Sequence, residues 1–209
     1  MRRTPIASVL FLASVAVAAC GGPAPAVSPT AGVVATPTAE TAPSASSRPS
    51  SPSPAASAAA DLALLDTLPA DIQGVALMRD LETTAEIIAG GRLAPQVDAL
   101  AVGVYLGPGS SPSDDLAIAN VARLRPGTFT DTWFRSWRDT YNEGACETSG
   151  GVAAGVAETE IGGRTTHIGS CIGGVHTYHV HLTGPDRVVS ITALGEARFG
   201  ERVVAGLTE

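Results

Sequence analysis

Apolar residues recur at every second position in several parts of the chain, which is the period of a half-buried strand. The alternation is clearest over residues 100–106, which are followed by a loop rich in Gly, Pro and Ser. Gly-rich turns separate the last strand segments, as in hairpins. The pattern predicts strands over residues 74–78, 100–106, 116–124, 156–161, 164–168, 176–182 and 188–193.

Three other segments have the spacing of amphipathic helices. Asp80 is suited to be the N-cap of the first, which the Gly90–Gly91 pair ends. The second covers residues 128–141, where Thr128 and Asp131 form a capping arrangement. Its aromatic face is expected to pack on the sheet, the alternative being a platform for a sugar or a peptide. The aromatic residues are Trp133, Phe134, Trp137 and Tyr141, and the third helix carries Phe199, Val203, Val204 and Leu207.

The order of these elements predicts an α+β fold, with an antiparallel sheet and helices packed on one face of it. The first six elements follow the β-α-β-β-α-β order of a ferredoxin-like unit, and C-terminal hairpin strands and a terminal helix extend it. Residues 61–209 have the length of one ordinary globular domain.

The N-terminus has the composition of a targeting segment, with two arginines before an apolar run too short to span a bilayer. Val17-Ala18-Ala19-Cys20 resembles the lipobox of bacterial lipoproteins, in which cleavage precedes a cysteine that becomes lipid-modified. The resemblance implies that residues 1–19 are a lipoprotein signal peptide and that Cys20 carries lipid, palmitate included. The chain would then be anchored at the extracytoplasmic face of the cell membrane. An ordinary secretory signal is the alternative.

Residues 20–60 contain the acylated cysteine and a segment dominated by Pro, Ala, Ser and Thr. This segment shows no apolar periodicity, so it is expected to be a disordered linker. A spacer between membrane and domain is the favoured interpretation. A stalk for O-glycosylation or for passage through a cell-wall layer is the alternative.

Charge and composition exclude several classes of function. The chain has a formal net charge of −7, and residues 61–209 hold nineteen acidic residues against ten arginines. No basic stripe is present, which argues against nucleic-acid binding. The sequence contains no lysine, which excludes Schiff-base and P-loop chemistry.

Three cysteines are an odd number for an exported protein. If Cys20 carries lipid, Cys146 and Cys171 remain as one pair. Cysteines in an oxidising compartment usually join, so a disulfide between these two is expected.

All four histidines lie within residues 167–181. Two of them are two residues apart and would leave the same face of a strand. A glutamate would pair with a third across the Gly162–Gly163 turn. This spacing suits zinc or copper, and the expected ligands are Glu158, His167, His179 and His181.

The histidines also fit the solvent face of an amphipathic strand, because Tyr178, Val180 and Leu182 alternate with them. The length of the preceding loop decides which side chains share a face. A four-residue loop pairs His167 with Tyr178, whereas a five-residue loop pairs it with His179.

Two further patterns resemble catalytic sites. Gly169-Ser170-Cys171-Ile172-Gly173 has the outline of a nucleophile elbow, but a strand instead of a helix is expected to follow it. Glu158 and Glu160 form a carboxylate pair, which is more typical of solvated charges when it flanks a tight hairpin. No residue is therefore assigned a catalytic role.

These observations favour a non-enzymatic, lipid-anchored binding or interaction module outside the cytoplasmic membrane. Its partner would be a small molecule, a lipid, a polysaccharide or an envelope protein, and no cofactor is expected. A zinc- or copper-binding envelope protein is the first alternative, and a structural envelope component is the second. A deep concavity would favour ligand binding, and convergent His and Glu side chains would favour a metal.

Overall fold

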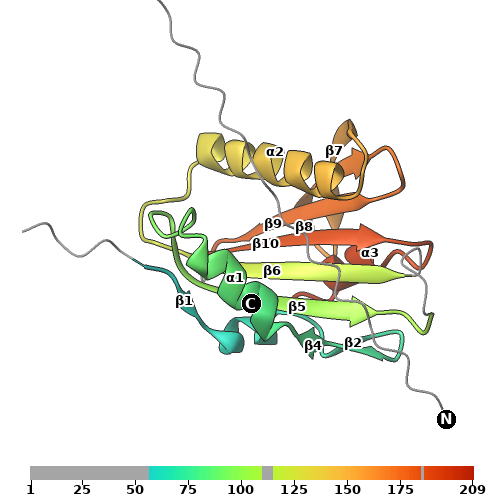
Figure 1. The fold of residues 1–209 in the computed structure, drawn as a ribbon, viewed down its shortest axis with the longest axis horizontal. Coiled ribbons are helices and arrows are strands. Elements are labelled where there is room, and N and C mark those ends of the chain that lie inside the picture. The colour runs from blue at the N-terminus through green and yellow to red at the C-terminus, as the bar shows by residue number, and fades with distance from the viewer. Residues whose placement is uncertain (1–56, 110–114, 185) are drawn as a thin grey trace, which may run out of the picture. The chain divides into compact units, whose positions relative to one another are not determined.

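The computed structural model describes residues 57–109, 115–184 and 186–209 (Figure 1). Most of the regular structure consists of long antiparallel strands, and two of the helices are longer than the others. The helices are η1 (Leu62–Thr67, a 3-10 helix), α1 (Leu81–Ala89), α2 (Asp131–Thr148) and α3 (Phe199–Ala205). The strands are β1 (Ala59–Ala60), β2 (Asp71–Ile72), β3 (Val75–Ala76), β4 (Met78–Arg79), β5 (Val97–Leu106), β6 (Leu116–Leu124), β7 (Ala153–Ile161), β8 (Arg164–Cys171), β9 (His176–Leu182) and β10 (Arg187–Leu194).

The main sheet has the strand order β1-β5-β6-β10-β9-β8-β7, and β4 also pairs with β5. All of its pairings are antiparallel except the short one between β1 and β5. The strands β2 and β3 form a separate small hairpin. The predicted α+β class with a mostly antiparallel sheet is confirmed.

The ferredoxin-like strand order is not confirmed. In a split β-α-β unit, a helix joins two parallel strands that have another strand between them. Here α1 joins β4 and β5, which are antiparallel neighbours, and α2 joins β6 to β7 across three intervening strands. The succession of the long strands and of α1 and α2 along the chain was predicted, but the order in the sheet follows from the antiparallel run β7-β8-β9-β10, whose last strand, β10, pairs with β6.

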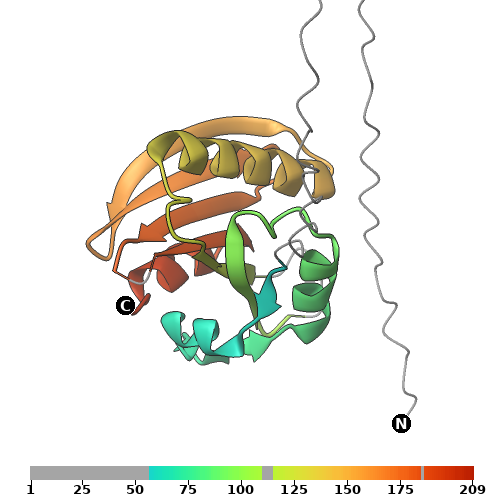
Figure 2. The same ribbon diagram turned by 90° about the vertical axis from the view of Figure 1, so that its left-hand side faces the viewer.

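The prediction that helices pack on one face of the sheet is wrong. Helices α1 and α2 cover one face, and η1 and α3 cover the other. Figure 2 shows β9 and β10 between α2 and the C-terminal helix. Strand β9 is consequently buried on both sides: Thr177 and His179 face α2, and Tyr178 faces α3.

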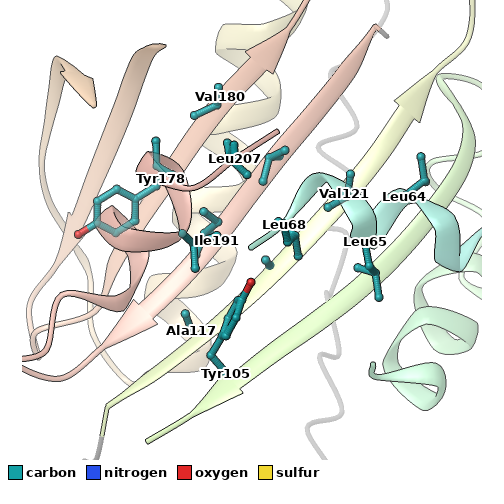
Figure 3. Packing of buried hydrophobic residues seen from close by; sticks show 14 of the residues in the cluster. Leu64, Leu65, Leu68, Tyr105, Ala117, Val121, Tyr178, Val180, Ile191 and Leu207 are labelled. Carbon is teal, nitrogen blue, oxygen red and sulfur yellow. The ribbon is translucent and has the colours of Figure 1, made fainter. Parts of the chain in front are cut away.

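The larger core lies on the face covered by η1 and α3 (Figure 3). Small and branched side chains of the strands pack there against leucines of η1. The fully buried Tyr105 donates a hydrogen bond of 2.6 Å from its hydroxyl to the carbonyl oxygen of Pro69. The labelled core residues are Leu64, Leu65, Leu68, Tyr105, Ala117, Val121, Tyr178, Val180, Ile191 and Leu207.

Capping side chains set the starts of both long helices on the other face. The Asp80 carboxylate accepts from the Thr83 amide at 2.9 Å, which confirms the predicted cap of α1. The cap of α2 is Thr130, whose hydroxyl accepts from the Trp133 amide, and not Thr128 as predicted. This helix also continues to Thr148, well beyond the predicted end.

The predicted disulfide is confirmed: Cys146 near the end of α2 is bonded to Cys171 at the end of β8, with their Cα atoms 5.3 Å apart. A second close approach holds the same two elements together. A Cβ atom added at Gly169 would overlap the Thr177 hydroxyl and lie 2.7 Å from the Asn142 amide, so only glycine lets α2 lie this close to β8.

The predicted targeting segment, Cys20 and almost all of the predicted linker lie outside the described residues. The described structure already includes contacts of residues that precede 61, the expected start of the domain. Ala59–Ala60 pair with β5, and the carbonyl oxygen of Ser57 accepts a hydrogen bond from Arg125 at 2.9 Å. Within the described part of the chain, none of the helices has the length and apolar character needed to cross a membrane.

Candidate ligand-binding groove

A groove with a volume of 420 Å³ lies between α1 and α2 on their common face of the sheet. Ile87 and Leu93 form the wall on the α1 side, and Leu100 of β5 lies in its floor. These side chains also pack in the smaller hydrophobic core on this face. The groove is therefore a gap in a packed layer, bounded by apolar side chains held in place by that core.

Aromatic residues of α2 form the opposite wall. Trp133, Trp137 and Tyr141 follow one another at intervals of four residues, which places them on one helix face. The rings of the two tryptophans are 5.4 Å apart between centroids and tilted by 35°. Phe134 lies on the adjacent face and is buried in the core. The predicted packing role of the aromatic residues is thus confirmed for Phe134, and Trp133 and Trp137 also pack against this core while they line the groove with Tyr141.

The polar side chains of the groove carry no charge. Gln96, Ser136 and Thr140 contribute amide and hydroxyl groups, and none of the lining residues is an Asp, Glu, Arg or His. Burial raises the pKa of Tyr141 above its ordinary value, so its hydroxyl is neutral at pH 7. An uncharged ligand is therefore the kind that the lining can accept without leaving a charge unpaired.

Asn120 of β6 lines this groove, and one of its side-chain atoms is an uncommitted hydrogen-bond acceptor. Its Nδ2 donates to the Tyr141 hydroxyl oxygen at 2.8 Å, and Thr192 donates to the same oxygen at 3.1 Å. The Asn120 Oδ1 atom is buried without a hydrogen-bond partner among the described residues. Such an atom costs about 1–3 kcal/mol, which an N–H or O–H donor of a ligand would recover.

A chain of buried hydrogen bonds fixes the Trp137 ring. The indole Nε1 donates to Ser190 Oγ at 2.9 Å, and Ser190 Oγ lies 3.0 Å from His179 Nδ1. On the other side of the imidazole, His179 Nε2 lies 2.9 Å from Asn142 Oδ1, which also accepts from the Thr177 hydroxyl. All of these groups except the indole are buried.

The protonation state of His179 follows from its surroundings. Burial, together with the charge of the nearby Arg138 and the neighbouring His167, lowers the pKa of His179 to about 3. The neutral ring has one N–H, which must be on Nε2 because Asn142 Oδ1 can only accept. Nδ1 then accepts from Ser190, whose oxygen accepts from Trp137. Each proton in the chain has one position, and the Trp137 ring is held in a single orientation.

The four residues predicted as metal ligands share one face of the sheet. Of the two loop lengths considered between β8 and β9, the five-residue loop is the one formed, because His167 lies opposite His179. Glu158 lies opposite His167, as predicted. No three His, Cys, Asp or Glu side chains in the described residues are arranged to hold a metal ion. His167 Nδ1 is 3.1 Å from Glu158 Oε2, and His181 Nε2 is 3.1 Å from Asp186 Oδ1.

The four residues expected to bind zinc or copper, Glu158, His167, His179 and His181, therefore do not converge on one point in the described structure: Glu158 and His167 pair with each other, whereas His179 and His181 have other partners. Both nitrogens of His179 are bonded to protein side chains, and the ring of His181 is stacked on Phe129 at 3.4 Å between centroids. The alternative of a solvent-exposed strand face is also wrong, since His179 is fully buried beneath α2.

The two patterns that resemble catalytic sites do not form them. Cys171 is in the disulfide, and β8 turns directly into β9 without the helix that a nucleophile elbow requires. Glu158 and Glu160 lie on the exposed edge strand β7. Glu158 is paired with His167, which leaves Glu160 as a surface charge.

Asn120, Gln96, Ile87 and Leu93 were not predicted as site residues. Asn120 could have been noticed, because it is an uncharged polar residue in the middle of a strand whose only other polar residue is Arg123, near its end. The others carry no signal in the sequence, since their role depends on where α1 lies relative to α2.

The chain matches no protein-family model, and no match is found among curated proteins or solved structures. The groove and its chemistry therefore carry the functional argument alone.

Proposed function

We propose that this protein is a lipid-anchored, extracytoplasmic binding module, and that its folded domain binds a small, neutral, ring-containing ligand in the groove between α1 and α2. The ligand stacks on Trp133 and Trp137 and donates a hydrogen bond to Asn120 Oδ1. The observation that carries this proposal is a buried, unpartnered acceptor in an uncharged groove with an aromatic wall.

The size and the lining of the groove support this ligand class. Pockets of about 300–1,000 Å³ with mostly apolar walls and a few fixed polar groups are typical of small-molecule sites. Here the volume is 420 Å³, and Trp137 is oriented by the buried chain through Ser190 and His179. A wall that is already ordered loses little conformational entropy on binding.

The proposed role is binding without a chemical step. The groove lining contains hydroxyl and amide groups but no His, Cys, Asp or Glu that could serve as base or activated nucleophile beside them. Tyr141 is neutral, and its oxygen accepts two hydrogen bonds that fix the position of the ring.

The hydrogen bond to Asn120 is tested with a matched pair of probes, 2-naphthol and 2-methoxynaphthalene, which differ in the hydroxyl donor. We expect the full chain to bind 2-naphthol about tenfold more tightly, as one buried hydrogen bond implies. In Asn120→Leu, which keeps the size of the side chain, the two affinities should become equal. Isothermal titration calorimetry measures both.

Equal affinities of the wild-type chain for the two naphthalenes would contradict the role of Asn120. If neither probe binds up to its solubility limit, the proposal of a neutral ring ligand is wrong and a structural envelope role gains support. The circular dichroism spectrum of Asn120→Leu, compared with that of the wild type, checks that the variant is folded.

The anchor rests on the lipobox resemblance of Val17-Ala18-Ala19-Cys20 and on the Pro-rich segment after it. In a bacterium with lipoprotein processing enzymes, we expect radiolabelled palmitate to enter the wild-type chain and the protein to sediment with membranes. Cys20→Ala should take up no label and leave the membrane fraction, because it lacks the cysteine that would carry the acyl chains needed for stable anchoring. Equal labelling of the two proteins would contradict acylation at Cys20.

A further inference from the structure

A second cavity, with a volume of 330 Å³, lies on the face of the sheet opposite to the groove, between α3 and the strands β8, β9 and β10. The apolar side chains of Ile168, Ala193 and Phe199 form part of its lining. Two of its polar side chains already satisfy each other, since Ser170 Oγ lies 3.1 Å from His176 Nδ1. The cavity and the groove share no lining residue, so either can hold a ligand without the other.

The hydroxyl group of Tyr178 is an unused hydrogen-bonding group at this cavity. Tyr178 is only 5% exposed, and its ring packs so closely on α3 that a Cβ atom at Gly200 would overlap it. Figure 3 shows the hydroxyl directed away from the labelled core residues, and it forms no hydrogen bond with any residue that the structure describes. Burial and then the Glu201 carboxylate raise the pKa of Tyr178. The hydroxyl is therefore neutral at pH 7, and its oxygen is free to accept.

Negative charge predominates around this hydroxyl. Glu196, Glu201 and Arg198 line the cavity, and the Arg198 guanidinium is paired with the Glu201 carboxylate. Glu196 forms no ion pair within the described part of the chain. The Asp115 carboxylate lies against the turn that enters α3, whereas Arg202 is not among the lining residues. Three carboxylates thus lie around one guanidinium, and the charge left over is negative.

We infer that this cavity binds a small organic cation, a primary ammonium on a short apolar body. The ammonium would donate hydrogen bonds to the Tyr178 hydroxyl oxygen and to the Glu196 carboxylate, which gives each of them the partner that it lacks. The apolar body would lie against Ile168 and Phe199. An anion of the same shape would be repelled by the carboxylates.

The test uses the purified full chain and two probes of the same shape, n-butylammonium and the uncharged 1-butanol. Both lack a ring, so neither belongs to the ligand class proposed for the groove. Titrations at pH 8, where exposed imidazoles are mostly neutral, and at constant ionic strength are followed by ¹H–¹⁵N NMR, so that the amides that shift locate the site. We expect saturable n-butylammonium binding with shifts centred on β8, β9 and residues 195–201, and about tenfold weaker binding of 1-butanol.

Four variants make the result decisive. Tyr178→Phe keeps the buried ring and should weaken n-butylammonium binding about fivefold, as loss of one hydrogen bond implies. Glu196→Gln, at an exposed residue, should weaken it about threefold. Arg198→Gly removes the cation that competes for Glu201, at a residue whose φ of 56° favours glycine, and should tighten binding about threefold. Glu86→Gln removes an exposed carboxylate on α1 and should bind as the wild type does.

Both weakening substitutions preserve the core, because one retains the ring of Tyr178 and the other changes an exposed side chain. Equal affinities for the two probes, unchanged affinity in Tyr178→Phe or Glu196→Gln, weaker binding in Arg198→Gly, or shifts centred on another part of the chain would overturn the inference.

Discussion

Replacing both Cys146 and Cys171 by alanine is expected to lower the free energy of unfolding by about 3 kcal/mol. The bond joins residues 25 apart in the sequence, and a loop of this length restricts the unfolded chain by about that amount. Both cysteines are also buried beside Val175, so the variant loses packing as well. Loss of the bond would free the β7–β8 hairpin from the end of α2.

Urea denaturation of the wild type and the double variant measures this change. The wild type with reductant should approach the stability of the variant, and the variant itself should not respond to reductant. A difference below about 1 kcal/mol between the wild type and the variant would contradict the structural role of the bond, because removal of a native disulfide from a small domain typically costs about 2–5 kcal/mol.

Lowering the pH from 7.5 to 4.5 is expected to cost about 2–3 kcal/mol of stability through His179 alone. Burial lowers the pKa of this residue to about 3 in the folded protein, against about 6.5 in the unfolded chain. The unfolded state therefore binds a proton between these two values, and the folded state does not. The contribution of His179 is complete above pH 6.5 and is lost as the pH falls, by about 1.4 kcal/mol per unit.

The variant His179→Gln isolates this effect. It has no imidazole, so its stability should fall less steeply between pH 7.5 and 4.5 than that of the wild type. His176→Gln changes an exposed histidine on the same strand and should keep the wild-type slope. Urea unfolding at several pH values gives the three slopes. Identical slopes for wild type and His179→Gln would show that His179 is not buried in its neutral form.

Local signals in the sequence predicted much of the fold. The Gly162–Gly163 turn set the register of its hairpin, so that Glu158 lies opposite His167 as expected. Asp80 capped the first helix, and the two downstream cysteines formed a bond. Each of these features depends on residues close in sequence or on simple pairing rules.

The role of the histidines could not be predicted in the same way. Along β9, Thr177 and His179 alternate with Tyr178 and Val180, which is the pattern of a strand with one solvent-exposed face. In the structure α2 covers that face, because the polar groups satisfy one another through Asn142 and need no water. Polarity in the sequence cannot distinguish a solvated side chain from one whose partner comes from a distant helix.

The groove was beyond prediction for a related reason. Its aromatic wall is visible in the spacing of Trp133, Trp137 and Tyr141, but a helix face packed on a sheet has the same spacing. The separation of α1 from α2 leaves these half-buried rings partly exposed along the groove. The order of strands in the sheet likewise depends on long-range pairing, which the succession of elements does not specify.

Native mass spectrometry of the full chain, purified from membranes of the cells that make it, tests the central claim most directly. The account predicts a neutral organic molecule bound non-covalently to the wild-type protein, and its loss from Trp137→Ala combined with Asn120→Leu. The claim would be contradicted by a wild-type mass that corresponds to the covalent chain alone, or to the chain with a metal ion as its only addition.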